Sequence, residues 1–217
     1  NPDGSFTCTL FWEFEGPRSF STTKTDDAVR RFFAEEFPDA VPLMPSLLDD
    51  FKTNPTGSLV TIRCAPWCFK DKVALIGDAA HAVVPFYGQG MNAAFEDCVV
   101  LDECLAEFSQ DRQRAFAEYF RRRKENTDAL ADLAIENFIE MRDKTASRVF
   151  RAKKKLDHLL EGLLPGTYLP LYAMVTFTRL PYSMAAKRAR FQDRVVLGSL
   201  IGAASLLLIA VLLALLH

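Results

Sequence analysis

The feature that most constrains this chain is an uncharged, apolar run over residues 195–216. Of its 22 residues, 18 are Ala, Val, Ile or Leu. As a helix rising about 1.5 Å per residue, the run would extend about 33 Å, against about 30 Å of bilayer hydrocarbon. A helix buried in a protein core is the alternative, but 22 residues without a charge exceed the usual length of one. The run therefore predicts a transmembrane tail anchor after a globular body.

The residues before this run support the same interpretation. Residues 179–194 contain five basic side chains and one acidic side chain, a net charge of +4. A positively charged flank is retained on the cytoplasmic side of a membrane. We therefore expect a tail-anchored protein whose body faces the cytosol. The chain shows no signal peptide and begins with Asn rather than Met, so we also expect it to be a fragment.

Charge and cysteine content exclude two classes of function. The 26 basic and 28 acidic residues give a net charge of −2, which provides no long-range attraction to nucleic acid. Cys64 and Cys68 are four residues apart without a matching second pair, so we predict no metal site.

Local patterns predict an α/β fold. Strands are expected over 5–14, 59–63 and 72–76, and helices over 26–37, 46–51, 91–108 and 111–142. The basic run 121–124 is surrounded by acidic residues, which favours a solvated helix face over a binding patch. The expected domains are a substrate-domain sheet with short helices (1–65), part of a cofactor domain (66–110), a helical region (111–194) and the anchor (195–216).

The most informative stretch is Gly77–Asp97, which reads GDAAHAVVPFYGQGMNAAFED. A short strand delivers Gly77 and Asp78 to its carboxyl end, which is where open α/β sheets place ligands. The Asp78 carboxylate can accept hydrogen bonds from sugar-type hydroxyls. The alternative is that Asp78 only stabilises a turn.

A glycine-rich loop follows about ten residues later. Gly88-Gln89-Gly90 allows close approach of a ligand and opens the helix that begins near Met91. The free amides of Gly90, Met91 and Asn92 would then face a phosphate or the pyrimidine edge of a flavin, because a helix N-terminus stabilises negative charge. Alone this loop is a weak signal, but its spacing from Gly77-Asp78 strengthens it.

These residues carry a family resemblance. The order Gly-Asp-Ala-Ala-His, then Pro, then Gly-x-Gly-x-Asn resembles the second flavin fingerprint of the class A flavoprotein aromatic monooxygenases. Within that family, the fuller wording of 77–98, the segment NFIEMR (137–142) and the segment LPLYAMVTF (169–177) resemble the kynurenine hydroxylases. The resemblance covers nearly the whole chain, including the tail. It implies the C-terminal part of a Rossmann-like FAD/NAD(P)-binding fold with a mixed-sheet substrate region, C-terminal helices and a transmembrane tail helix.

The resemblance also implies an activity. Its members use FAD, with NADPH as co-substrate and O2, to hydroxylate L-kynurenine to 3-hydroxy-L-kynurenine through a flavin hydroperoxide. It implies a location in the mitochondrial outer membrane. Two alternatives stay open: a related class A enzyme acting on another aromatic substrate, and a non-catalytic tail-anchored protein that keeps a flavin fold.

Residue roles follow from the resemblance, position by position. Asp78 would bind the flavin ribityl or pyrophosphate region, and the amides of Met91 and Asn92, after Gly90, would hold the isoalloxazine pyrimidine edge. We assign no catalytic acid or base, and we interpret His81 as a structural hydrogen-bonding residue. Asn137 and Tyr172 would bind the amino-acid end of the substrate, and Pro85 and Phe86 would line the pocket for its aromatic ring. Glu140 lies on the same helix face as Asn137 and would support it.

The chain departs from the family pattern in one respect. Nothing in it supplies the strand–Gly-x-Gly-x-x-Gly–helix unit that binds the ADP moiety, or the arginine expected to bind the substrate carboxylate. We therefore expect FAD binding to require the N-terminal portion of the same enzyme as a partner.

Overall fold

The computed structural model describes residues 1–215, with side chains described as far as Leu206. The chain divides into two compact units, Asn1–Ser58 and a second unit that begins at Leu59.

The first unit contains helix α1 (Asp26–Glu36), the short 3-10 helix η1 (Val41–Leu43) and helix α2 (Leu47–Thr53). The Thr25 side chain accepts a hydrogen bond from the Ala28 amide and caps α1. Aromatic rings fill the interior: Trp12 stacks on Phe32 with centroids 4.1 Å apart, and Phe33 is buried. This unit is therefore stabilised mainly by aromatic packing.

The second unit begins with an antiparallel hairpin of two short strands, β1 (Cys68–Phe69) and β2 (Val73–Ala74). The turn leads into α3 (Asp78–His81) and the 3-10 helix η2 (Pro85–Tyr87). Two long helices, α4 (Gly90–Glu107) and α5 (Arg112–Ile139), follow, and α5 continues as a π-helical turn, η3 (Glu140–Lys144). The remaining elements are α6 (Arg148–Leu163), α7 (Leu171–Phe177) and α8 (Tyr182–Leu215).

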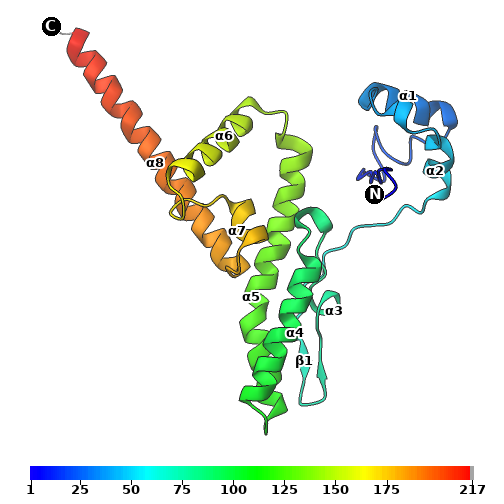
Figure 1. The fold of residues 1–217 in the computed structure, drawn as a ribbon, viewed down its shortest axis with the longest axis vertical. Coiled ribbons are helices and arrows are strands. Elements are labelled where there is room, and N and C mark those ends of the chain that lie inside the picture. Colours follow the sequence, from blue (N-terminus) through cyan, green and yellow to red (C-terminus); the bar gives the residue numbers. More distant parts are fainter. Residues whose placement is uncertain (216–217) are drawn as a thin grey trace. The chain divides into compact units, whose positions relative to one another are not determined.

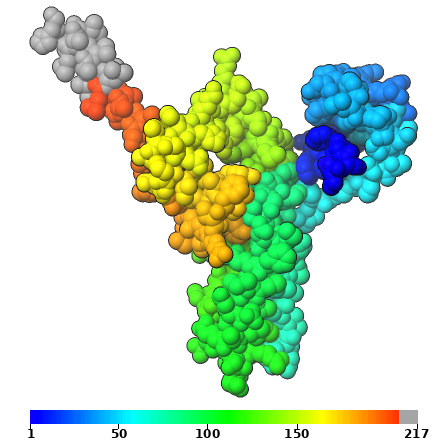
Figure 2. Space-filling view, viewed as in Figure 1, coloured from blue at the N-terminus to red at the C-terminus, as the bar shows by residue number. Residues whose placement is uncertain are grey.

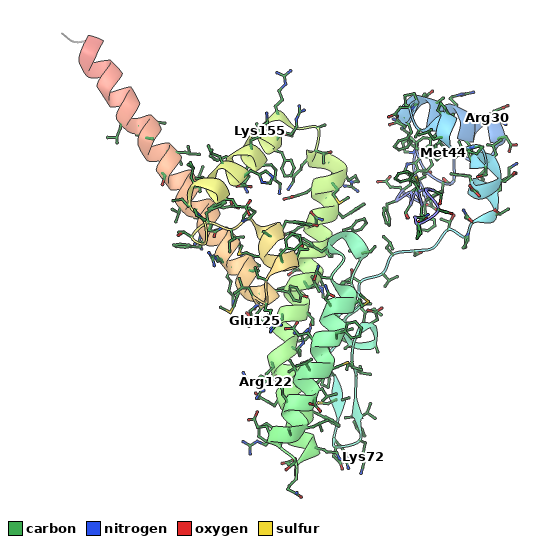
Figure 3. All side chains as sticks on the ribbon, in the orientation of Figure 1. Arg30, Met44, Lys72, Arg122, Glu125 and Lys155 are labelled. Atoms are coloured by element: carbon green, nitrogen blue, oxygen red, sulfur yellow. The ribbon has the colours of Figure 1, made fainter. Side chains whose placement is uncertain are left out.

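The antiparallel pair α4–α5 is the centre of this unit, and the first half of α8 packs on α5 (Figure 1). One apolar cluster joins the start of α4 to α5, α7 and α8 through Ala93, Leu130 and Met174. A second cluster joins the hairpin to the other half of α5 through Trp67 and Tyr119. Figure 3 marks Lys72 at the hairpin tip and Arg122 and Glu125 along α5. The loop 77–90 is thus held between two packed clusters.

The predicted α/β fold class is wrong. Among residues 1–215 the only strands are β1 and β2, and helices predominate. The segments 5–14 and 59–63 have strand-like composition, but they make only isolated backbone hydrogen bonds, such as Ile62 N–H to Ala82 O at 2.8 Å. A strand needs a neighbouring strand to pair with, and the described residues provide none for these segments. Neither a Rossmann-like parallel sheet nor a mixed substrate sheet is therefore formed by residues 1–215.

The prediction of a transmembrane tail helix over 195–216 is also contradicted. Within the described part of the chain, no helix combines the length and the apolar content that crossing a bilayer requires. The apolar run continues a longer helix, α8, whose first half carries charges such as Lys187 and Arg190 and packs on protein. The last two residues, 216–217, lie outside the described residues.

The helix predictions are more accurate. The helices expected over 26–37, 46–51, 91–108 and 111–142 correspond to α1, α2, α4 and α5, with boundaries that shift by a few residues. The four-part domain division stays a prediction.

Candidate flavin and substrate site

Two glycines shape the loop that precedes α4. Gly77 has φ +60°, and a Cβ added there would lie 3.3 Å from the Ala94 Cβ. A side chain at this position would therefore strain the backbone and crowd α4. Gly88 also has a positive φ, +65°, but the space beside it is open. Gly77 thus allows close packing on α4, whereas Gly88 leaves the loop accessible from outside.

A buried carboxylate, Asp97 of α4, organises the turn before α3. Its Oδ2 accepts hydrogen bonds from the Gly77 amide at 3.0 Å and from His81 Nε2 at 2.5 Å. Its Oδ1 accepts a hydrogen bond from Arg123 Nε of α5 at 2.7 Å. His81 is buried in this network, which agrees with its interpretation as a structural hydrogen-bonding residue.

The electrostatics of Asp97 favour its charged form. Burial alone would raise the pKa of this carboxyl, but hydrogen bonds from His81, Arg123 and the Gly77 amide outweigh burial and hold the pKa below its ordinary value. Arg123 is 1% exposed, so the prediction that the run 121–124 is a solvated face is wrong for this residue. The run itself does not show which arginine is buried. Arg123 differs from Arg121 and Arg122 only in the side of the helix on which it lies.

The start of α4 offers donors to a ligand. Its N-cap residue, Gln89, makes no capping hydrogen bond, and the first amide with a backbone acceptor is that of Ala93. The amides of Gly90, Met91 and Asn92 have no backbone acceptor among residues 1–215. The space beside Gly88, two residues before α4, is open. The donors and the space fit the electron-rich pyrimidine edge of a flavin.

Asp78 lies at the first position of α3, directly after Gly77. Its side chain is exposed, and the described residues show no hydrogen bond or ion pair to its carboxylate. An exposed carboxylate at this turn is available to a ligand hydroxyl. Asp78 and the start of α4 are linked through Gly77 and Asp97, so two of the predicted cofactor contacts belong to one supported structure.

The predicted substrate residues gather around η2. Asn137 of α5 donates a hydrogen bond from Nδ2 to the Phe86 carbonyl at 2.7 Å. The Phe86 ring stacks on Phe138, with centroids 4.5 Å apart. Pro85 opens η2 and is exposed. The hydrogen bond between Asn137 and Phe86 brings together segments 51 residues apart in the sequence.

Tyr87 joins the other predicted residues to this group. Its ring stacks on Tyr172 of α7, with centroids 6.0 Å apart. Burial, together with the nearby carboxylates of Glu140 and Glu136, raises the pKa of Tyr87 to about 12, so its hydroxyl stays protonated at neutral pH. Glu140 itself pairs with Lys154 at 3.4 Å. Figure 2 shows the orange surface of the α7 region against the green surface of the helices that precede it in the sequence.

Comparison with known proteins gives a consistent result. Residues 53–134 match the family profile described as FAD binding domain. Over 196 residues, 90% of this chain, the sequence is 55% identical to kynurenine 3-monooxygenase from Salinispora arenicola, covering 43% of that protein. The chain is homologous to the kynurenine 3-monooxygenases. Relatives with the same name from Flavobacterium psychrophilum and Dictyostelium discoideum are each 49% identical, over 90% and 86% of this chain.

These matches confirm the predicted resemblance and the prediction of an FAD-binding region. The chain spans less than half the length of the kynurenine 3-monooxygenases it matches, 43% of the Salinispora protein and 44% of the Flavobacterium protein. The predicted mitochondrial outer-membrane location is wrong: several matched relatives are bacterial, including that from Myxococcus xanthus, and the described residues contain no helix fit to span a membrane.

The structure thus collects the predicted residues into two neighbouring groups. One contains Asp78 and the first residues of α4, and the other surrounds η2. Sequence reasoning did not single out Tyr87, Asp97 and Arg123. Tyr87 could have been found from its place between Phe86 and Gly88 in the fingerprint, whereas nothing local distinguished Asp97 or Arg123 from surface charges.

Proposed function

We propose that this chain supplies part of the FAD site and part of the substrate site of an enzyme that hydroxylates L-kynurenine to 3-hydroxy-L-kynurenine with NADPH and O2. The observation that carries the proposal is the continuity of the two groups: the loop 85–90 bears the aromatic contacts at one end and the free helix amides at the other. The names of the matched relatives support the choice of substrate.

On the cofactor side, this chain would bind FAD through dipoles and one carboxylate. The amides of Met91 and Asn92 would donate to the pyrimidine edge, and Asp78 would accept from a hydroxyl of the ribityl or pyrophosphate region. Bound FAD supplies the activation of oxygen. The chain's own residues hold the ring system against η2, where Pro85 and Phe86 would contact the aromatic ring of the substrate.

On the substrate side, only one end of the Asn137 side-chain amide has a hydrogen-bond partner among the described residues. Its Nδ2 donates to the Phe86 carbonyl, which leaves Oδ1 free to accept from the substrate ammonium group. The exposed Tyr172 hydroxyl can donate to the substrate carboxylate, and its ring is steadied by Tyr87. Glu140, one helical turn from Asn137, would add negative charge on the ammonium side.

The test is a flavin and product assay on the protein at its full natural length. We expect a flavin absorbance band after purification with FAD, and kynurenine-dependent NADPH oxidation that yields 3-hydroxykynurenine. Hydroxylation of another aromatic acid in preference to kynurenine would favour a related class A enzyme. Absence of bound flavin would contradict the proposal altogether and favour a non-catalytic protein.

A further inference from the structure

Four consecutive basic residues on α5 separate into two kinds. Arg121 and Arg122 both pair with Glu118, and Lys124 pairs with Asp128 at 2.6 Å, so these three side chains make contacts near the surface of α5. Arg123 alone points inward and is 1% exposed. A buried guanidinium needs several acceptors, because an unpaired charge in a protein interior is strongly unfavourable.

All the acceptors of Arg123 lie on α4. Its Nε donates to Asp97 Oδ1 at 2.7 Å, its Nη2 donates to the Ala93 carbonyl at 3.1 Å, and its Nη1 pairs with Glu96 at 2.5 Å. Ala93 is the first residue of α4 whose amide has a backbone acceptor. Arg123 therefore contacts the helix directly behind the amides proposed to face the flavin.

Asp97 extends the same contact to the other cofactor element. One carboxylate oxygen accepts a hydrogen bond from Arg123, and the other accepts hydrogen bonds from the Gly77 amide and His81. Gly77 directly precedes Asp78. Asp97 thus connects α4 to the Gly77-Asp78 turn, and Arg123 pairs with the same carboxylate from α5.

We propose that Arg123 is a positioning residue for the flavin site, which holds the first turn of α4 and the Gly77-Asp78 turn in a fixed relation so that both face one ligand. The inference rests on the proposed flavin site. Arginine suits this role because its planar fork bonds to a carboxylate and a carbonyl at once, whereas lysine presents one compact charge that cannot reach all three acceptors.

The test compares Arg123→Lys with Arg121→Lys in the protein at its full natural length. Arg123→Lys keeps a positive charge beside Asp97 but loses the bond to the Ala93 carbonyl. We expect about a tenfold rise in the FAD dissociation constant, a more negative midpoint potential of the bound flavin, and faster hydrogen exchange at the amides of residues 90–93 in the FAD-free protein. Arg121→Lys, on the same helix, should change none of the three.

The outcomes separate the possible results. Wild-type FAD affinity and potential in Arg123→Lys, with or without a lower melting temperature, would overturn the proposal and leave Arg123 a purely structural residue. If Arg123→Lys does not fold, Glu96→Gln is the second variant, because it weakens the ion pair between Arg123 and the half-exposed Glu96. A rise of about twofold or more in the FAD dissociation constant then supports the proposal, and no rise overturns it. Failure of the wild type to bind FAD defeats the proposed function itself, and the exchange measurement then still shows whether Arg123 orders α4.

Discussion

The start of α4 and the aromatic group around η2 lie in the same unit but are held in different ways. Behind the α4 start, buried charges are fully paired: Asp97 receives three hydrogen bonds, and Arg123 contacts three groups on α4. Around η2, the contacts are one hydrogen bond from Asn137 and two ring stacks, and Tyr172 remains 54% exposed. The network behind the proposed cofactor contacts is therefore part of the core, whereas the substrate side is close to the surface.

This difference has a physical meaning. Buried ion pairs are costly to break, because removing one partner leaves the other charged and unsolvated. Exposed rings and amides can be altered with little effect on folding. We therefore expect substitutions in the buried network of Asp97 and Arg123 to affect stability and FAD together, and substitutions on the substrate side to affect kynurenine alone.

The largest effect should come from Asp97→Ala. It leaves the Arg123 guanidinium and the Gly77 amide without their buried acceptor, which should lower the free energy of unfolding by about 3–5 kcal/mol. Denaturant unfolding of the protein measures this loss. Asp102→Ala, at an exposed position of the same helix, is the matched control and should stay within about 0.5 kcal/mol of the wild type. Equal stabilities of the two variants would contradict the distinction between core and surface.

The next effect in size should come from Asp78→Ala. Loss of the carboxylate leaves a ligand hydroxyl without its acceptor and should weaken FAD binding by about 1–3 kcal/mol. Because the Asp78 side chain is exposed and makes no hydrogen bond or ion pair in the described residues, folding should be unchanged. FAD titration gives the dissociation constant, with Asp71→Ala at the hairpin tip as control. A wild-type dissociation constant would leave Asp78 as a turn residue only.

The acid response of the buried network should be smaller. The folded pKa of Asp97 lies below its ordinary value of 3.8, so the stability it contributes is complete above that pH and is lost as the pH falls through the folded pKa. The loss cannot exceed about 1.4 kcal/mol per pH unit. Other carboxyls, such as Glu118, also have lowered pKa values, so the measurement is the difference between wild type and Asp97→Asn from pH 5 to pH 3. A constant difference would contradict the role of Asp97.

The sequence singles out candidates for ligand contact, but it does not identify the framework behind them. Gly77, Asp78 and Gly90 are recognisable because the fingerprint requires these residue types in this order. Asp97 and Arg123 are not, because a charged residue on a helix is usually exposed and only tertiary packing shows which one turns inward. The expected strands over 5–14 and 59–63 failed for a related reason, since residue composition does not specify a pairing partner.

The smallest effects should follow from Asn137→Ala and Tyr172→Phe, and they examine the substrate side directly. Asn137→Ala removes both the acceptor proposed for the substrate ammonium group and the hydrogen bond to Phe86, so the kynurenine KM should rise about tenfold. Tyr172→Phe keeps the stack on Tyr87 and loses one exposed hydroxyl, so KM should rise by about two- to fivefold. The FAD dissociation constant should be unchanged in both variants, because neither residue contacts the Asp97 network. Steady-state NADPH oxidation against kynurenine concentration, after FAD occupancy is checked, measures KM. A wild-type KM in both variants would remove these residues from the substrate site, and loss of FAD would show that the two sides depend on one another.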